Sequence, residues 1–427
     1  MLPADHPLRL ELAAEVHARP PEPLDTPSRA TYVAVMVAPE DRVGEHAHLA
    51  RLCEHHGVAP PAPRATHFSA QLGALRLKWE RHGEFSGITL FAPGQSVQPF
   101  SEPVASMLPP GWLAGLPGAT IVAAHARLIS EASAPPDAAA LAEHFAGNIV
   151  VGAEIGEGAG LVYTDFRVHA DGFSRFLVVD RSFTRRQSGR MLQRLFEIEA
   201  YRMMALLALP IARQQSSQMR SIEQELSTLT DRIAVDDSND EALLHDLTRL
   251  AAQIEHSKSA SQFRIGACRA YHELVITRIE ELREGRIKGI QTIEEFMARR
   301  LAPAVATCIT VSTRLQDLSE RVSQASALLS TRVDITRERQ NQALLASMDR
   351  RALLQLRLQQ TVEGLSVAAI VYYAAGLVGY LAKAGIAGGL PLQTDLAVGI
   401  SIPIVAVLAI LGIRRVRRSL NSADREL

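Results

Sequence analysis

The chain has 427 residues, with 45 Lys and Arg against 46 Asp and Glu, and this near balance gives no reason to expect a nucleic-acid partner. Because charged residues occur throughout the first twenty positions, we expect no cleaved secretory signal. The three cysteines, Cys53, Cys268 and Cys308, match no CxxC or Cys/His zinc spacing, so we expect reduced, partly buried thiols.

The first 181 residues alternate between strand and helix patterns. Residues 31–37 predict a strand and residues 40–56 an amphipathic helix. A strand pair turning near His82 follows, and its first strand has the alternation of a sheet with one face in water. The apolar positions of that strand are Leu75, Leu77 and Trp79, and the polar ones are Arg76, Lys78 and Glu80.

The rest of this region continues the same alternation. A helix is predicted at residues 136–146, and Asp171-Gly172 predicts a hairpin turn between the last two strands. Strands are predicted at 120–129, 148–153, 161–169 and 173–179. Residues 1–181 therefore predict an α+β domain with a mixed, largely antiparallel sheet.

From residue 182 to residue 363 the pattern is helical and no strand is expected. A helix at 183–213 is followed by an antiparallel pair at 222–235 and 241–257, whose apolar residues recur at the three- and four-residue steps of a coiled coil. Another helix is predicted from residue 261 to 286. The last begins near Thr292 and continues into an apolar run. We interpret 182–363 as a long-helix stalk.

Two uncharged runs, residues 365–382 and 396–413, are each nearly long enough to cross a hydrocarbon layer of about 30 Å. A buried helical hairpin in a soluble protein is the alternative, but apolar runs of this length are rare there. We predict a transmembrane hairpin over residues 364–413, with the bilayer as a partner and only the loop at 383–395 outside.

The basic tail, residues 414–427, sets the expected orientation. A cluster of arginines directly after a span usually stays in the cytoplasm and contacts anionic headgroups. We therefore expect an inner-membrane protein with two spans and with both termini in the cytoplasm. The topogenic residues are Arg414, Arg415, Arg417 and Arg418.

Candidate site residues are few. His48 and His55 lie seven apart on the predicted helix at 40–56 and are weak metal ligands, the alternative being a solvated helix face. A divalent cation is thus a possible partner. Nucleotide-binding, serine-hydrolase and metalloprotease motifs do not occur, so we predict no catalytic residue and no cofactor.

Within the first span, Tyr373, Gly376 and Gly379 allow two interpretations. Small residues let helices pack closely, and tyrosines favour membrane interfaces. Alternatively, these residues line a pore formed by several copies. Neither span contains a carboxylate, which disfavours a transport mechanism in which side chains coordinate the ion.

Two resemblances extend this interpretation. The opening HPLRLELAAEVHARPP, the length and the C-terminal hairpin resemble a bacterial family of uncharacterised membrane-anchored proteins, domain of unknown function 3422. This resemblance implies no known activity. The order of parts is similar to CorA-type magnesium channels, but their Gly-Met-Asn signature is absent and the equivalent region runs from Gly376 to Lys383.

The sequence thus predicts a membrane-anchored, cytoplasm-facing protein of structural or interaction type that forms homo-oligomers through its stalk helices. A divergent CorA-like cation channel or transporter is the alternative, and a membrane-tethered enzyme comes third.

Overall fold

In the computed structural model the chain forms two compact units, Met1–Ala327 and Leu328–Leu427. The finer division at residues 181, 363 and 413 stays a prediction. The residues that the structure describes are 3–10, 12–13, 20–94, 100–133, 136–235, 239–387 and 393–423.

The first unit contains a nine-stranded sheet in the order β2-β3-β4-β1-β5-β8-β7-β6-β9. Among the described strands, only β5 and β8 pair in parallel, so the expected mixed, largely antiparallel sheet is confirmed. The strands are β1 (Ser28–Met36), β2 (His67–Leu72), β3 (Leu75–Arg81), β4 (Phe85–Pro93), β5 (Ala119–Ser130), β6 (Val151–Ile155), β7 (Gly160–Thr164), β8 (Ser174–Asp180) and β9 (Gly285–Arg286).

The helices confirm the α+β class. They are α2 (Arg42–His55), α3 (Ala138–His144), α4 (Arg185–Leu206), α5 (Ala208–Ala234), α6 (Asp240–Leu282), α7 (Ile293–Ala387) and α8 (Thr394–Ala423). Short 3-10 turns lie at Pro39–Asp41, Val104–Met107, Leu113–Gly115 and Glu131–Ser133.

Both faces of the sheet are covered. On one face, Phe196 of α4 stacks on Tyr32 of β1 and meets Phe176 of β8 edge-on. The opposite face carries two apolar clusters. One joins α2 and the 3-10 turns to β2, β3 and β4, around Trp79 and Leu90, and the other joins α3 to β7 and β8, around Phe145.

The covered faces correct one expectation. Leu75, Leu77 and Trp79 of β3 are buried as predicted, but Lys78 and Glu80 of the supposedly wet face are buried as well. Alternation of polar and apolar residues normally indicates a solvated face. Here α4 lies over that face, so the polar residues of β3 pair with polar residues of the helix.

The helical part of the first unit also differs from the predicted one. The helix expected at 183–213 breaks at Leu207, where α4 ends and α5 begins, and α6 runs through Ser261, where two helices were expected. The prediction of no strand after residue 182 is wrong at β9, which pairs with β6. Two residues are too few to produce a strand pattern.

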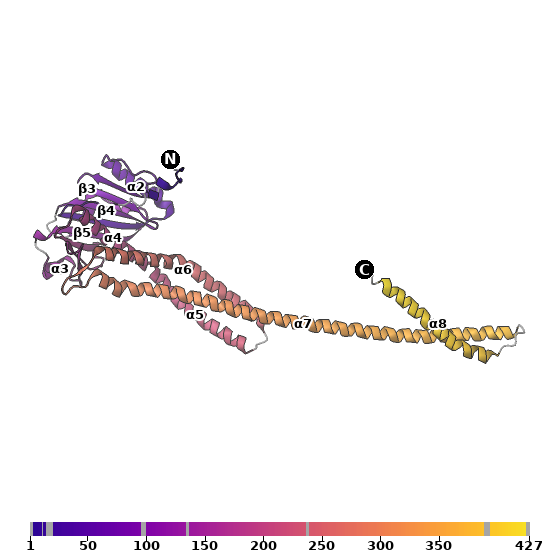
Figure 1. Cartoon of the computed structure of the whole chain (residues 1–427). Coiled ribbons are helices and arrows are strands. Elements are labelled where there is room, and N and C mark those ends of the chain that lie inside the picture. The colour runs from indigo at the N-terminus through magenta and orange to yellow at the C-terminus, as the bar shows by residue number, and fades with distance from the viewer. Residues whose placement is uncertain are drawn as a thin grey trace. The chain divides into compact units, whose positions relative to one another are not determined.

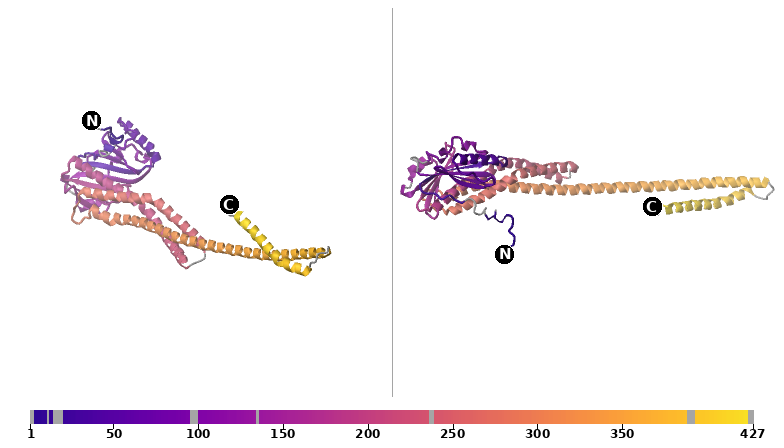
Figure 2. Two further views of the ribbon diagram at one scale, coloured as in Figure 1. Left: turned by 45° about the vertical axis from the view of Figure 1, so that its right-hand side comes forward. Right: turned by 90° about the horizontal axis from the view of Figure 1, so that it is seen from above.

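Helices α5, α6 and the first part of α7 run side by side (Figure 1, Figure 2). Helix α6 is antiparallel to both α4 and α5. Arg194 and Glu197 of α4 pair with residues near the C-terminus of α6, and Glu225 near the end of α5 pairs with Arg249 near the start of α6. The predicted antiparallel pair of helices is therefore confirmed. Arg314 of α7 pairs with Glu223 of α5.

The second unit contains the rest of α7 and α8. Helix α7 continues without interruption from Ile293 into the first apolar run, as predicted. Among the described residues, two helical segments, within Ile293–Gly385 and at Thr394–Gly412, are long and apolar enough to cross a membrane, and little of their apolar surface is buried. Of the predicted loop at 383–395, residues 388–392 lie outside the described part of the chain.

Candidate functional site

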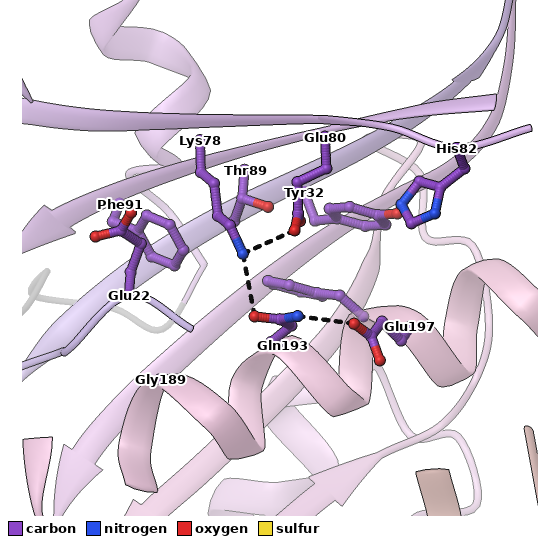
Figure 3. Close-up of a pocket in the computed structure, with 11 residues that line it drawn as sticks. Glu22, Tyr32, Lys78, Glu80, His82, Thr89, Phe91, Gly189, Gln193 and Glu197 are labelled. Atoms are coloured by element: carbon purple, nitrogen blue, oxygen red, sulfur yellow. Dashed lines mark hydrogen bonds and ion pairs between the residues drawn. The ribbon is translucent and has the colours of Figure 1, made fainter. Parts of the chain in front are cut away.

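A polar network lies between β3 and α4, in a pocket lined by residues of both. The Lys78 Nζ donates to Glu80 Oε1 at 2.9 Å and to Gln193 Oε1 at 3.1 Å. Gln193 Nε2 in turn donates to Glu197 Oε1 at 2.8 Å (Figure 3). Strand alternation places Lys78 and Glu80 on one face, and one helical turn separates Gln193 from Glu197. Hydrogen bonds between these side chains therefore connect a strand to a helix that is distant in the sequence.

The polar network continues beyond the pocket to α6. Glu197 pairs with Arg278, and Arg278 lies 3.3 Å from Glu281. Arg194 of α4 donates to the Glu281 carboxylate at 2.9 Å and to its backbone oxygen at 2.8 Å. These pairs alternate in sign, so each charge of the network has an opposite charge beside it. The network joins the sheet to α4 and α4 to α6.

The segment before β1 closes one side of the pocket. Glu22 accepts hydrogen bonds from Ser69 and from Arg76, whose Nε lies 2.6 Å from Glu22 Oε2. The backbone at Glu22 crosses α4 at Gly189, and a Cβ on Gly189 would lie 1.7 Å from the Glu22 carbonyl oxygen. Only glycine permits this crossing, so Gly189 holds the segment against the helix.

Tyr32 completes the apolar side of the pocket. Its ring stacks on Phe196 with centroids 4.9 Å apart, and Gly87 on the neighbouring strand leaves the space that the ring occupies. Burial, together with the charges of Tyr201 and three nearby glutamates, holds the pKa of Tyr32 well above its usual value. The hydroxyl is therefore protonated and can donate a hydrogen bond.

The pocket offers room for solvent rather than for an organic substrate. Its cavity volume of about 20 Å³ is enough for a single water, which needs about 10–15 Å³. Lys78, Gln193 and Glu197 are already bonded to one another, so the arrangement fixes the sheet against the helices. A catalytic role for these residues gains no support from this geometry.

The structure does not bring His48 and His55 together with further ligands. His48 stacks on Trp112, and its Nε2 lies 2.9 Å from the Trp112 carbonyl oxygen. His55 meets His56 edge-on. Within the part of the chain that the structure describes, no group of three or more His, Cys, Asp or Glu residues is placed to hold a metal ion. The metal site stays an untested prediction.

Tyr373, Gly376 and Gly379 share one side of α7 and line a groove beside α8. Val398 and Ile402 of α8 form the other wall. A Cβ on Gly379 would lie 3.2 Å from Val398 Cγ2, whereas one on Gly376 would have no described atom within 4 Å. Gly379 is thus the position where the two helices approach closely.

The arginine cluster after the second apolar run is helical, because α8 continues to Ala423. It comprises Arg414, Arg415, Arg417 and Arg418. Arg415 is exposed, and the side chains of the other three lie outside the described part of the structure.

Sequence reasoning missed the polar network and the cysteine contact. No local pattern relates Lys78 to Gln193 or Glu197 to Arg278, because the partners come from elements far apart in the chain. Cys268 of α6 and Cys308 of α7 are both buried, and the neighbouring Cys308 thiol, together with burial, raises the pKa of Cys268. In the sequence, the only sign of this contact was that each cysteine lies in a row of apolar residues at helical spacing.

The fold and these sites define an α+β protein that combines a nine-stranded mixed sheet, long helices and two helices apolar enough to cross a membrane. The family described as "Protein of unknown function (DUF3422)" matches residues 4–420, and the chain belongs to this family, as its opening sequence predicted. No curated protein and no solved structure matches the chain. The resemblance to CorA-type channels is not supported by any of these comparisons.

Proposed function

We propose that this protein is a membrane-anchored structural or interaction protein that faces the cytoplasm and assembles into homo-oligomers through α7. The main support is the exposed apolar surface of α7 between the first unit and the first apolar run. Leu344, Met348 and Val362 are 60%, 57% and 57% exposed. Apolar side chains at this density on one helix are typical of a surface that a partner covers.

The arrangement of these side chains supports a helical partner. At about 100° per residue, Leu344, Met348 and Val362 lie on one side of α7, whereas Leu353 lies on the opposite side. A second copy of the chain would present the same side, and two such helices can bury their apolar rows against each other. The polar network between sheet and helices would then hold each cytoplasmic unit firmly on its own helices.

The anchor is the apolar hairpin. Both apolar helical segments are mostly exposed. The arginines from Arg414 to Arg418 favour a cytoplasmic C-terminus, and two spans return the chain to its starting side. The proposed location is the inner membrane, and a periplasmic signal from a reporter fused after Leu427 would contradict the orientation.

The oligomer is tested on the full-length protein in mild detergent by light scattering that separates protein from detergent mass. We expect a multiple of the 46.5 kDa chain mass for the wild type. The triple variant Leu344→Gln, Met348→Gln, Val362→Gln should shift the protein toward the monomer. The matched control Leu353→Gln alters an equally exposed leucine on the other side and should leave the mass unchanged. A wild-type monomer would refute the proposal.

A divergent cation channel is the second candidate, and the groove at Tyr373 and Gly376 is the observation in its favour. Several copies could bring these grooves around one axis, since two helices alone cannot enclose an aqueous path. The uncharged spans and Lys383 near the expected entrance weigh against a cation path. Flux of divalent cations into liposomes that contain the oligomer would support this candidate over the first. A membrane-tethered enzyme remains third, because the pocket on β3 holds about one water.

A further inference from the structure

Two cysteines meet between α6 and α7 in the first unit. Cys268 of α6 and Cys308 of α7 are each 1% exposed. Each follows a buried apolar residue by three positions, Ile265 on α6 and Val305 on α7, so both lie in the rows by which these helices pack. Each thiol changes the pKa of the other, as only close neighbours do. The two sulfur atoms therefore lie next to each other inside the helix interface.

The register of the two helices independently places these cysteines at the same level. Helix α6 is followed directly by the connection to α7, and Ser319 Oγ of α7 donates to Glu255 Oε1 of α6 at 2.6 Å, so the helices run antiparallel. Cys268 lies thirteen residues after Glu255, and Cys308 lies eleven residues before Ser319. The difference of two residues corresponds to an offset of about 3 Å along the helix axes.

The spacing of packed helices suits a disulfide bond at this position. Axes of helices in contact lie about 8–10 Å apart, and each Cα lies about 2.3 Å from its own axis. With the axial offset, facing Cα atoms are then about 4.5–6 Å apart. A disulfide joins Cα atoms that are about 4.4–6.8 Å apart. A bond between Cys268 and Cys308 therefore needs little movement of the backbone.

The surroundings of the pair favour the thiolate of Cys308. The neighbouring Cys268 thiol lowers the pKa of Cys308, and the charge of Arg213 on α5 lowers it further, against the opposing effect of burial. The same contact raises the pKa of Cys268. Because the thiolate is the form that reacts with oxidants, Cys308 is the attacking thiol and Cys268 the resolving thiol.

A weak turn of α7 gives a small oxidant access to the buried thiols. Pro303 lies inside the helix, five residues before Cys308, and a proline there removes one backbone hydrogen bond and disturbs the preceding turn. The Thr307 hydroxyl donates to the Pro303 carbonyl oxygen at 2.9 Å, a type of contact that often bends helices. Local opening of this turn exposes Cys308 while the rest of the unit stays folded.

We propose that Cys268 and Cys308 are a modification site at which hydrogen peroxide forms a reversible disulfide that fastens α7 to α6. Helix α7 continues without interruption into the first apolar run. The disulfide thus fixes the start of the helix that carries the candidate membrane span. The site is independent of the proposed oligomer.

The reaction takes place in two steps. The Cys308 thiolate attacks one peroxide oxygen, the O–O bond breaks, and the released hydroxide takes up the proton that the Cys308 thiol had lost. The Cys268 sulfur then attacks the sulfenic sulfur of Cys308, the S–O bond breaks, and the Cys268 proton leaves with the oxygen as water. The two thiols lose two electrons, and one peroxide is reduced to two waters.

The first test detects the bond itself in the full-length wild type. The protein is treated with hydrogen peroxide in mild detergent under native conditions, the remaining thiols are alkylated, and the protein is digested without reduction. Mass spectrometry should find a peptide pair linked through Cys268 and Cys308 in most molecules, and dithiothreitol should remove it. Two unlinked cysteines, whether alkylated or oxidised to sulfinic acids, or a link to Cys53 instead, would overturn the proposal.

The second test measures the effect of the bond on the first unit. A disulfide that closes a loop of about 40 residues should raise the unfolding temperature by about 5 °C, followed by fluorescence of Trp79 and Trp112. The control Cys53→Ser removes the buried cysteine of α2 and should keep this rise, whereas Cys308→Ser should lose it. An equal rise in Cys308→Ser and in the wild type would assign the effect to another oxidation and contradict the proposal. The linked peptide is measured on the wild type, so the first test holds even if Cys308→Ser does not fold.

Discussion

Lys78→Met should destabilise the first unit strongly, because it leaves a carboxylate buried without its cation. The Lys78 and Glu80 side chains are only 6% and 10% exposed, and their nitrogen and oxygen lie 2.9 Å apart. Removal of one partner of a buried ion pair costs about 3–5 kcal/mol. The substitution also takes a donor from Gln193, so the contact between β3 and α4 weakens further.

The double variant Lys78→Met, Glu80→Met distinguishes this reasoning from a simple loss of packing. Apolar replacement of both partners of a buried pair is often neutral or stabilising. We therefore expect the double variant to recover at least about 2 kcal/mol relative to Lys78→Met. A double-mutant cycle gives the coupling between the two side chains.

The assay is urea unfolding of the full-length protein in detergent, followed by tryptophan fluorescence. Trp79 and Trp112 both belong to the apolar cluster around β3, so their emission reports on the first unit. Arg249→Met serves as the control, because the Arg249 and Glu225 side chains are 45% and 34% exposed and such pairs contribute less than about 1 kcal/mol. A loss in Lys78→Met no larger than in this control would refute the reasoning.

Two further predictions concern the sheet unit. Gly189→Ala should lower the free energy of unfolding by about 3 kcal/mol, because the new Cβ would overlap the Glu22 backbone. The control Gly266→Ala, at a position on α6 with no atom near the new Cβ, should be neutral or slightly stabilising. Urea unfolding of both variants measures the difference. His125 is buried and stacked on Phe173, and burial lowers its pKa to about 4. Since the unfolded chain binds a proton there near pH 6.5 and the folded chain does not, about 3 kcal/mol of stability should be lost as the pH falls from 6.5 to 4. His125→Gln should remove this part of the pH dependence, and an identical slope in that variant would contradict the assignment.

The local elements of this protein were predictable because their signals are local. Alternating apolar residues located most strands, Asp171-Gly172 located a hairpin turn, and the uncharged run from residue 365 located the continuation of α7. Each of these signals depends on residues within one element. The sequence could also show that Gly376 and Gly379 share a helix side.

The polar network could not be predicted in the same way. The charges on β3 had the pattern of a solvated face, and only the packing of α4 over that face turns Lys78 and Glu80 into buried partners. Likewise, Gly376 and Gly379 are equivalent in the sequence, but only Gly379 lies against Val398. Such contacts depend on which surfaces meet in three dimensions, and a single sequence carries no direct record of that.

The short strand β9 has a consequence for the order in which the protein folds during synthesis. Among the described residues, the outer edge of β6 is paired by residues from the connection between α6 and α7, including Gly285, Arg286 and Gln291. These residues leave the ribosome more than a hundred positions after β6. An open strand edge invites pairing with other chains, so a nascent chain that stalls before Gly285 should be the species most prone to aggregation.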